Sequence, residues 1–310
     1  MRGAVPIVLA AALACALPSG PARAPAPSPL PTWIDGQGRL RAGAASGSAV
    51  AVDPAALARI AALSVHEEAG GYVASVRNLL EGPVEIELSL TGADNVASWP
   101  RLPHRMVLGP GEKRPVSLIE PVSPNRPGHF ELHLNALPGP PDARHGEVVY
   151  VLPLADGAAR ISQGFGGAFS HQDPENRYAV DFAVPVGTPV LAARDGIVMQ
   201  VVDEHAEAGL DRAAFASRAN HIRVLHEDGS MALYAHLDTG GARVAPGRAV
   251  RAGDLLGHSG NTGFSGGPHL HFVVQVNTGM RLESVPFSMQ GPDGPVPIPG
   301  ASGADARPAL

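Results

Sequence analysis

Two histidines stand on either side of Leu270 near the C-terminal end of the chain, at positions 269 and 271. On a β-strand, residues two apart point to the same face, so both imidazoles are expected to face one site while Leu270 enters the core. Taken alone, this pattern also fits two histidines on a solvated sheet face. Imidazole and carboxylate groups can hold zinc or transfer protons. Five residues of the C-terminal half form one such constellation: His171, Asp181, His236, His269 and His271.

Three signatures give these residues a context. Residues 180–183 read Val-Asp-Phe-Ala, followed by Pro-Val-Gly-Thr-Pro-Val, and residues 233–237 read Leu-Tyr-Ala-His-Leu. The third signature has two parts: residues 259–263 read Ser-Gly-Asn-Thr-Gly, and residues 266–272 read Gly-Gly-Pro-His-Leu-His-Phe. In this order the signatures resemble those of the lysostaphin-type zinc endopeptidases, also called LytM-domain peptidases. The resemblance covers about residues 159–290, and it implies a compact antiparallel β-sheet domain with zinc in a groove on one face.

The resemblance assigns a role to each of the five residues. In relatives, zinc is held by a histidine, by the aspartate of the first signature and by the second histidine of His-x-His, which here are His171, Asp181 and His271. Such a set leaves a fourth tetrahedral position for water, whose pKa zinc lowers to about 7. His236 and His269 correspond to family histidines beside that water. One is expected to accept its proton, and either can stabilise the tetrahedral intermediate or protonate the leaving amine.

Two positions depart from the family pattern. The first histidine often precedes the aspartate by four residues, whereas His171 and Asp181 are ten apart, so an insertion must loop out between them. Asp173 lies inside this insertion and is an alternative ligand. We favour Asp181 because it lies in the matching strand. A glutamate often follows the final His-Phe pair, where this chain has Val273, but that position holds no zinc in the family.

The remaining histidines of both domains match no catalytic position and are interpreted as structural or exposed. They are His104, His133 and His145 in the first domain and His205, His221, His226 and His258 in the second. Asn220 and Tyr234 are expected to be hairpin residues, with contact to substrate as the alternative for Tyr234.

Short strands must position the constellation. They are expected at residues 179–183, 189–193, 197–202 and 268–276, with a hairpin around Asp228-Gly229 that joins 221–226 to 230–236. Residues 203–219 are polar and Ala-rich, and they predict a surface excursion with a short helix. We expect this zinc metallopeptidase domain to span residues 156–290.

Residues 51–155 predict a separate domain. Asp53-Pro54 indicates a helix start, with the helix running to about Leu63. From Gly71 onward the apolar residues recur with a period of two, as in Val84, Ile86, Leu88 and Leu90. Together with the turns between them, and with residues 148–152 as the last strand, they predict a small antiparallel β-sandwich. The whole chain is therefore predicted to be all-β. The sandwich carries no apparent catalytic residue, and it either positions the enzyme or blocks its groove.

The two ends of the chain are expected to lie outside these domains. Residues 1–24 read as an export signal, too short for a confident membrane span, so no integral span is expected after its removal. Residues 25–50 predict a Pro/Ala-rich linker and residues 291–310 a disordered tail. Cys15, the only cysteine, lies in the signal, so the mature protein would contain no disulfide. A lipid anchor at Cys15 is the alternative.

Composition narrows the function. The formal net charge is −6 and no basic tract stands out, which argues against a nucleic-acid partner. We predict an exported, periplasmic or secreted, zinc metalloendopeptidase that hydrolyses bonds in peptidoglycan stem peptides or cross-bridges. The Arg-rich, Lys-poor composition favours D-alanine–diaminopimelate cross-links over glycine bridges. Two alternatives stay open: a non-catalytic LytM-domain activator of a cell-wall amidase, and a protease for a folded or secreted protein.

Overall fold

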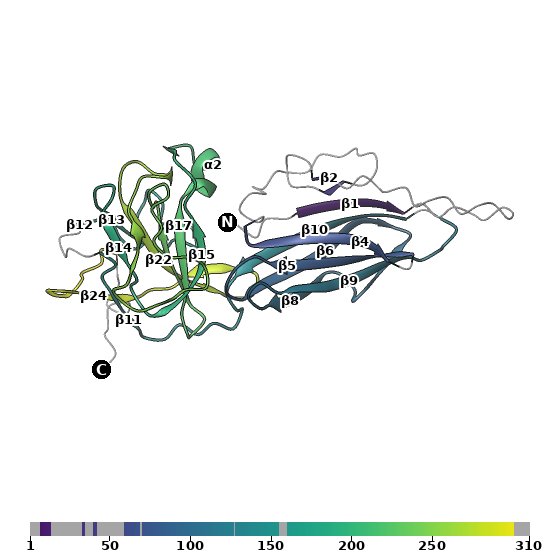
Figure 1. The fold of residues 1–310 in the computed structure, drawn as a ribbon, viewed down its shortest axis with the longest axis horizontal. Coiled ribbons are helices and arrows are strands. Elements are labelled where there is room, and N and C mark those ends of the chain that lie inside the picture. The colour runs from purple at the N-terminus through teal and green to yellow at the C-terminus, as the bar shows by residue number, and fades with distance from the viewer. Residues whose placement is uncertain are drawn as a thin grey trace. The chain divides into compact units, whose positions relative to one another are not determined.

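The structure is a computed structural model that describes residues 7–13, 33–34, 40–41, 59–68, 70–126, 128–154 and 160–300. Across these ranges the chain is all-β, as predicted, and its helices are only α2 (Arg212–Phe215) and the 3-10 helix η1 (Ala216–Arg218), shown in part in Figure 1. Neither is long and apolar enough to cross a membrane. The described residues divide into two compact units. The C-terminal unit contains residues 80–83 and 138–300, and the N-terminal unit contains the remainder.

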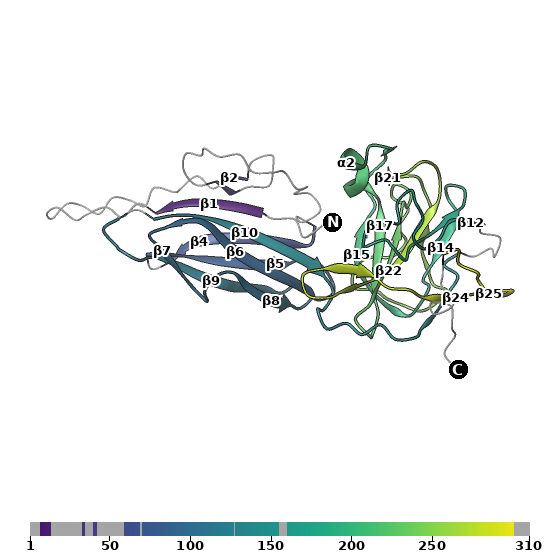
Figure 2. The same cartoon turned by 180° about the vertical axis from the view of Figure 1, so that it is seen from behind.

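The N-terminal unit is a β-sandwich of two mainly antiparallel sheets. One sheet has the order β2 (Trp33–Ile34), β3 (Leu40–Arg41), β1 (Ile7–Leu13), β10 (Gly128–Pro138), β6 (Val84–Asp94), β8 (His104–Leu108). The other has the order β4 (Ala61–Glu68), β5 (Gly71–Asn78), β9 (Lys113–Pro121), β7 (Val96–Trp99), and Figure 2 labels its strands together. Ile86 and Leu88 are fully buried, as the period-two pattern predicts. Tyr72 meets Phe130 across the two sheets with ring centroids 5.9 Å apart.

The C-terminal unit is built on one large sheet. Its order is β12 (Arg160–Gln163), β13 (Val180–Ala183), β22 (Leu270–Asn277), β18 (Met231–Ala235), β17 (His221–Leu225), β15 (Gly196–Val202), β19 (Ala249–Val250), and β23 (Leu282–Ser284) also pairs with β22. Smaller pairings join β14 (Pro189–Leu191) to β20 (Leu255–His258) and β16 (Ala208–Gly209) to β21 (Gly263–Phe264). β22 lies between β13 and β18, and every residue of it is buried. The surrounding core includes Tyr150, Phe182 and Phe272.

The boundary between the units differs from the expectation. It falls near residue 138 and not at 155/156, because β11 (Val149–Val151) pairs in parallel with β24 (Ser288–Gly291). Tyr150 of β11 is fully buried against Phe272 and Phe287 of the C-terminal core. The strand that was expected to complete the sandwich therefore belongs to the other unit.

Two further expectations need correction. The helix proposed from Asp53 to about Leu63 is wrong at its end, because Ala61–Glu68 is strand β4, whose Ala61 is buried opposite Asn78. Sheet pairing here overrides the local helix signal. The tail is ordered at least to residue 300, since β25 (Gly294–Pro295) pairs with β24, and Val296 and Ile298 pack against the core. Residues 301–310 lie outside the described residues.

The predicted export signal and linker lie largely outside the described residues. Within the signal, Ile7–Leu13 forms β1 and pairs antiparallel with β10. Only β2 and β3 are described within residues 25–50. The sites of signal cleavage and of the alternative lipid anchor therefore stay predictions.

Tyr234 provides a test of the C-terminal core. Its ring is fully buried, so it acts as a hairpin residue and does not reach substrate, and its hydroxyl accepts a hydrogen bond from the Ala193 backbone N–H at 2.7 Å. Tyr234→Phe keeps the ring but leaves that buried N–H without its acceptor. We expect a loss of about 1–3 kcal/mol in the free energy of unfolding, measured by chemical denaturation, with zinc content unchanged. An unchanged free energy of unfolding would contradict this role for the hydroxyl.

Candidate metal centre

Sheet pairing brings the predicted site residues together. Asp181 of β13 stands directly opposite His271 of β22, and Ala235 at the end of β18 stands opposite His271 on its other side. His236 follows Ala235 directly, so it lies just beyond the end of β18. His269 forms an isolated bridge with Gly260, one residue before β22. Leu270 is fully buried, as the alternation predicts.

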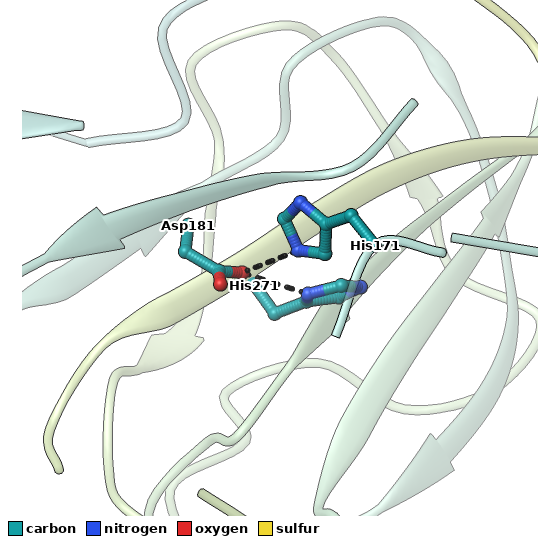
Figure 3. A group of neighbouring side chains, drawn as sticks. All are labelled: His171, Asp181 and His271. Atoms are coloured by element: carbon teal, nitrogen blue, oxygen red, sulfur yellow. Dashed lines mark hydrogen bonds and ion pairs between the residues drawn. The ribbon is translucent and has the colours of Figure 1, made fainter. Parts of the chain in front are cut away.

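Three buried side chains form a group able to hold a metal. Asp181 Oδ1 lies 3.2 Å from His171 Nε2 and 2.8 Å from His271 Nδ1. The three side chains point toward one another in Figure 3, and one ligand atom from each lies within 4.8 Å of the others. This is the one group of three histidine, cysteine or acidic residues with that property among the described residues.

The outer nitrogen of each histidine in this group has a partner of its own. His171 Nδ1 lies 2.8 Å from the Gly164 carbonyl oxygen, and His271 Nε2 lies 3.1 Å from Asn176 Oδ1. When those nitrogens carry the proton and donate to these oxygens, His171 Nε2 and His271 Nδ1 offer lone pairs toward Asp181. Such outer partners fix the tautomer and the ring orientation of metal-binding histidines. The donor set thus fits zinc, with two imidazoles, one carboxylate and a fourth position left over.

Asp181 is held as an anion. Burial alone raises the pKa of its carboxyl, but hydrogen bonds from His171 and His271 outweigh burial and hold that pKa well below its usual range. A cation bound between the three groups would stabilise the Asp181 carboxylate in place of the hydrogen bonds from His171 and His271. The second oxygen, Oδ2, accepts a hydrogen bond from Gln163 Nε2 at 2.9 Å. The Gln163 side chain is fixed in turn, because it also donates to Ser170 Oγ and accepts from the Phe169 N–H.

His236 and His269 lie beside this group. Their ring centroids are 4.4 Å apart, and His269 Nε2 is 3.9 Å from Asp181 Oδ1. His236 Nδ1 lies 2.6 Å from the Thr262 carbonyl and His269 Nδ1 lies 2.8 Å from the Gly267 carbonyl. Donation from both Nδ1 atoms leaves both Nε2 atoms free to take a proton. Burial, followed by the charges of His269 and His271, lowers the pKa of His236 to about 3, so this ring is neutral at pH 7.

The loop that holds these two histidines needs its signature glycines. A Cβ on Gly260 would lie 2.5 Å from the Asp238 nitrogen, and one on Gly263 would lie 2.6 Å from the Ala219 nitrogen. Gly263 also has a φ of +80°, which disfavours other residues. The close approach lets β21 pair in parallel with β16, so the excursion at residues 203–219, with its predicted short helix, packs on the loop behind His269.

The insertion between His171 and Asp181 supports the centre. Asn176, which contacts His271, donates through Nδ2 to Asp173 Oδ1 at 2.8 Å. Asp173 Oδ2 accepts from Arg212 of α2 at 2.6 Å. Asp173, the alternative ligand in the sequence, thus lies in a brace behind the site, while Asp181 stands with the two histidines. The chain Arg212–Asp173–Asn176 connects the excursion to a predicted zinc ligand.

The other histidines lie apart from the ligand group. In the C-terminal unit, His226 is buried, with Nδ1 on the Asp195 carbonyl, and His221 contacts the Ala219 carbonyl and Gln200. Sequence reasoning missed Gln163 and Asn176, whose contacts depend on how two loops meet. The weak signals are the position of Gln163 just before the glycine-rich segment and the unusual length of the insertion.

A buried His-Asp-His group on an antiparallel sheet, with two further histidines beside it, fits the metal centre of a metallopeptidase. Residues 175–282 match the family model described as Peptidase family M23. The chain therefore carries an M23 peptidase domain, within its C-terminal unit, and the resemblance to lysostaphin-type peptidases is confirmed. The prediction of zinc is confirmed by this family match together with the donor set.

Similarity to individual proteins is confined to part of the chain. Peptidoglycan DD-endopeptidase ShyA of Vibrio cholerae is 35% identical over 126 residues, which cover 39% of this chain and 26% of the relative. Glycyl-glycine endopeptidase ALE-1 of Staphylococcus capitis is 36% identical over 104 residues, covering 33% and 25%. The solved catalytic domain of lysostaphin from Staphylococcus simulans is 33% identical, covers 38% of this chain and 81% of that domain, and has a TM-score of 0.29. The chain spans about a quarter of the length of the curated relatives it matches.

The two aspartates can be separated by substitution. Asp181→Ala removes the carboxylate of the ligand group, so the purified protein should lose most of the approximately one zinc per chain expected of the wild type. Asp173→Ala removes only part of the brace and should retain most of the zinc. Metal analysis by mass spectrometry after dialysis measures both variants. The reverse ranking would mean that the insertion supplies the ligand.

Gln163 should tune zinc affinity without touching the metal. Gln163→Ala frees Asp181 Oδ2, and loss of such an outer partner lowers metal affinity by about 10- to 100-fold. Competition with a chromogenic chelator measures the change. Gln172→Ala is the matched control, because Gln172 lies in the neighbouring loop but donates only to the carbonyls of Gly166 and Gly167. Equal zinc affinity in wild type and Gln163→Ala would exclude the positioning role.

Proposed function

We propose that this chain is an exported zinc endopeptidase that hydrolyses peptide bonds of peptidoglycan cross-links. One observation carries the proposal: His236 and His269, whose Nδ1 atoms are held by backbone carbonyls, stand beside the three-residue group that could hold a metal. The M23 domain supports it, and so do relatives whose names state a peptidoglycan or glycyl-glycine endopeptidase. Action on the cell wall also agrees with the predicted export signal.

The chemistry follows from the proton positions. Zinc, when bound, supplies a water that ionises near neutral pH and an electrophile for the carbonyl of the scissile bond. His236 and His269 then move the proton. An unprotonated Nε2 accepts the proton from the attacking water. The imidazolium that results is stabilised by the Thr262 or Gly267 carbonyl, which accepts a hydrogen bond from the Nδ1–H group of the same ring.

The closeness of the two rings has its own effect. Two imidazoliums with centroids 4.4 Å apart would repel each other, so a proton on one ring disfavours a proton on the other. The ring that has accepted the proton can then deliver it to the nitrogen of the leaving amine. We therefore assign His236 and His269 to proton transfer and His171, Asp181 and His271 to the metal.

The substrate bond is a finer proposal. We assign the activity to D-alanine–diaminopimelate cross-links, on the basis of the Arg-rich, Lys-poor composition. The relatives include both a DD-endopeptidase and a glycyl-glycine endopeptidase, so their names do not discriminate. Digestion of sacculi of both wall types, with mass spectrometry of the new termini, distinguishes them. A protease for a folded or secreted protein would leave both kinds of sacculi intact.

A non-catalytic activator of a cell-wall amidase is the second candidate. Such an activator is expected to lack some of the metal-binding residues, whereas this chain has all five histidine and aspartate residues of the site, and they lie together. Purified sacculi incubated with this protein alone separate the two functions. New peptide termini support the endopeptidase, whereas release that depends on an added amidase supports the activator.

Substitution of His236 and His271 tests the assigned roles. His271→Ala leaves two ligands, so it should bind zinc weakly and melt earlier than wild type in the presence of zinc, because bound metal stabilises only the folded state. His236→Ala should bind zinc nearly normally, yet its turnover on sacculi should fall by about 10²- to 10⁴-fold. Metal content, thermal melting and product analysis measure these effects. Wild-type turnover in His236→Ala would rule out its role in proton transfer.

A further inference from the structure

A hollow lies on the outer face of the sheet β4-β5-β9-β7 in the N-terminal unit. Tyr72, Ala74 and Val76 of β5 enter the sandwich core, so Val73 and Ser75 face the other way. The hollow has a volume of about 730 Å³, within the range of about 300–1,000 Å³ of ligand-binding pockets. Ser75 is only 4% exposed although it faces outward, so the floor lies well below the rim.

One row of cross-strand neighbours runs across the hollow. His66 of β4 pairs with Val73, Val73 pairs with Leu118 of β9, and Leu118 pairs with Trp99 of β7. The row therefore places Trp99 at one side, small and apolar side chains on the floor, and His66 at the other side. Pairing of Ser75 with Pro115 continues the floor along the strands.

Trp99 is unusually exposed for so large an apolar side chain. Its relative exposure is 58%, and no ring or cation contact ties it to another described residue. Phe169, the other strongly exposed aromatic residue of the described chain, differs because it stacks on Phe264 beside the metal centre. An open indole face at the side of this floor suits a flat ligand whose own face is made of C–H groups.

The charges around the hollow limit the chemistry of that ligand. Glu68, Glu120, His66 and Lys113 line it, and His66 Nε2 lies 3.5 Å from Glu68 Oε2. Two carboxylates against one ammonium disfavour a polyanion such as nucleic acid or an acidic lipid surface. Lys113, the only lysine of the chain, forms no ion pair with another described residue. Separate donors and acceptors around an apolar floor match an uncharged ligand rich in hydroxyl and amide groups.

We propose that this hollow binds the glycan strand of the cell-wall polymer. The Trp99 indole stacks on the C–H face of an N-acetylated hexosamine ring, and Glu68, Glu120 and Lys113 bond its hydroxyl and acetamide groups. The identity of the polymer rests on the proposed function, whereas the sugar chemistry rests on the hollow itself. A second binding module on the chain raises the effective concentration of the peptidase at its polymer.

The test uses the full chain and a tetramer of N-acetylglucosamine as the probe. Calorimetric titration should give saturable binding that Trp99→Ala weakens by about tenfold or more. Val122→Ala is the matched control, because Val122 is 66% exposed on the same unit but does not line the hollow. Both variants alter exposed side chains, and Trp99→Phe, which keeps an aromatic face, should retain part of the affinity.

Two further measurements locate the ligand. Acylation of Lys113, followed by mass spectrometry, should be slowed by the tetramer. Zinc-free protein, held in chelator so that it cannot hydrolyse its target, should bind sacculi more strongly in the wild type than in Trp99→Ala. Absence of saturable sugar binding, equal binding by Trp99→Ala, or preference for a sugar-free stem peptide would each overturn the proposal.

The outcomes separate this inference from the proposed function. Hydrolysis of a sugar-free cross-linked peptide by Trp99→Ala at the wild-type rate, with weakened sugar binding, supports both. Trp99-dependent sugar binding without any hydrolysis by the wild type refutes the endopeptidase and leaves the sugar site standing. Hydrolysis that depends on His271, without sugar binding, refutes the sugar site and leaves the endopeptidase standing.

Discussion

The C-terminal unit depends on keeping one buried carboxylate charged. An ionised side chain away from water is costly unless hydrogen bonds or a metal compensate it. Asp181 receives that compensation from three directions: His271 across the β13–β22 ladder, His171 from the preceding loop and Gln163 from β12. This one carboxylate is positioned by the order of the strands, by the glycine-rich segment after β12 and by the length of the loop that follows.

The support extends beyond the strands. Three loops interlock around the centre, since Asn176 of the insertion contacts His271, Arg212 of the excursion holds Asp173, and β16 pairs with β21. Phe169 and Phe264 stack with ring planes 7° apart, and Arg212 lies over Phe264. Because each loop is held by the next, the protein itself fixes the positions of these side chains, which favours tight binding of a metal.

Sequence reasoning singled out all five histidine and aspartate residues, four of them from short local signatures and His171 from the family resemblance. Their assigned roles stay predictions. The partners of those residues were not predictable, since Gln163 reaches Asp181 and Asn176 reaches His271 only after distant loops fold together. The same limit explains the misplaced boundary, because Tyr150 packs against Phe272 and Phe287, which lie more than a hundred positions later in the chain. The Pro- and Gly-rich composition of residues 291–300 predicted disorder, but β25 pairs with β24, and Val296 and Ile298 pack against the core.

His236 has a backbone φ of +62°, in the left-handed region, and its carbonyl accepts the Gly260 N–H. A non-glycine residue there costs about 1–3 kcal/mol, which the neighbouring contacts must offset. The fold therefore holds a residue in a strained conformation at the position to which we assign proton transfer. In a lineage released from turnover, exchange of this histidine for glycine would relieve the strain, so selection for stability alone would erode this position early.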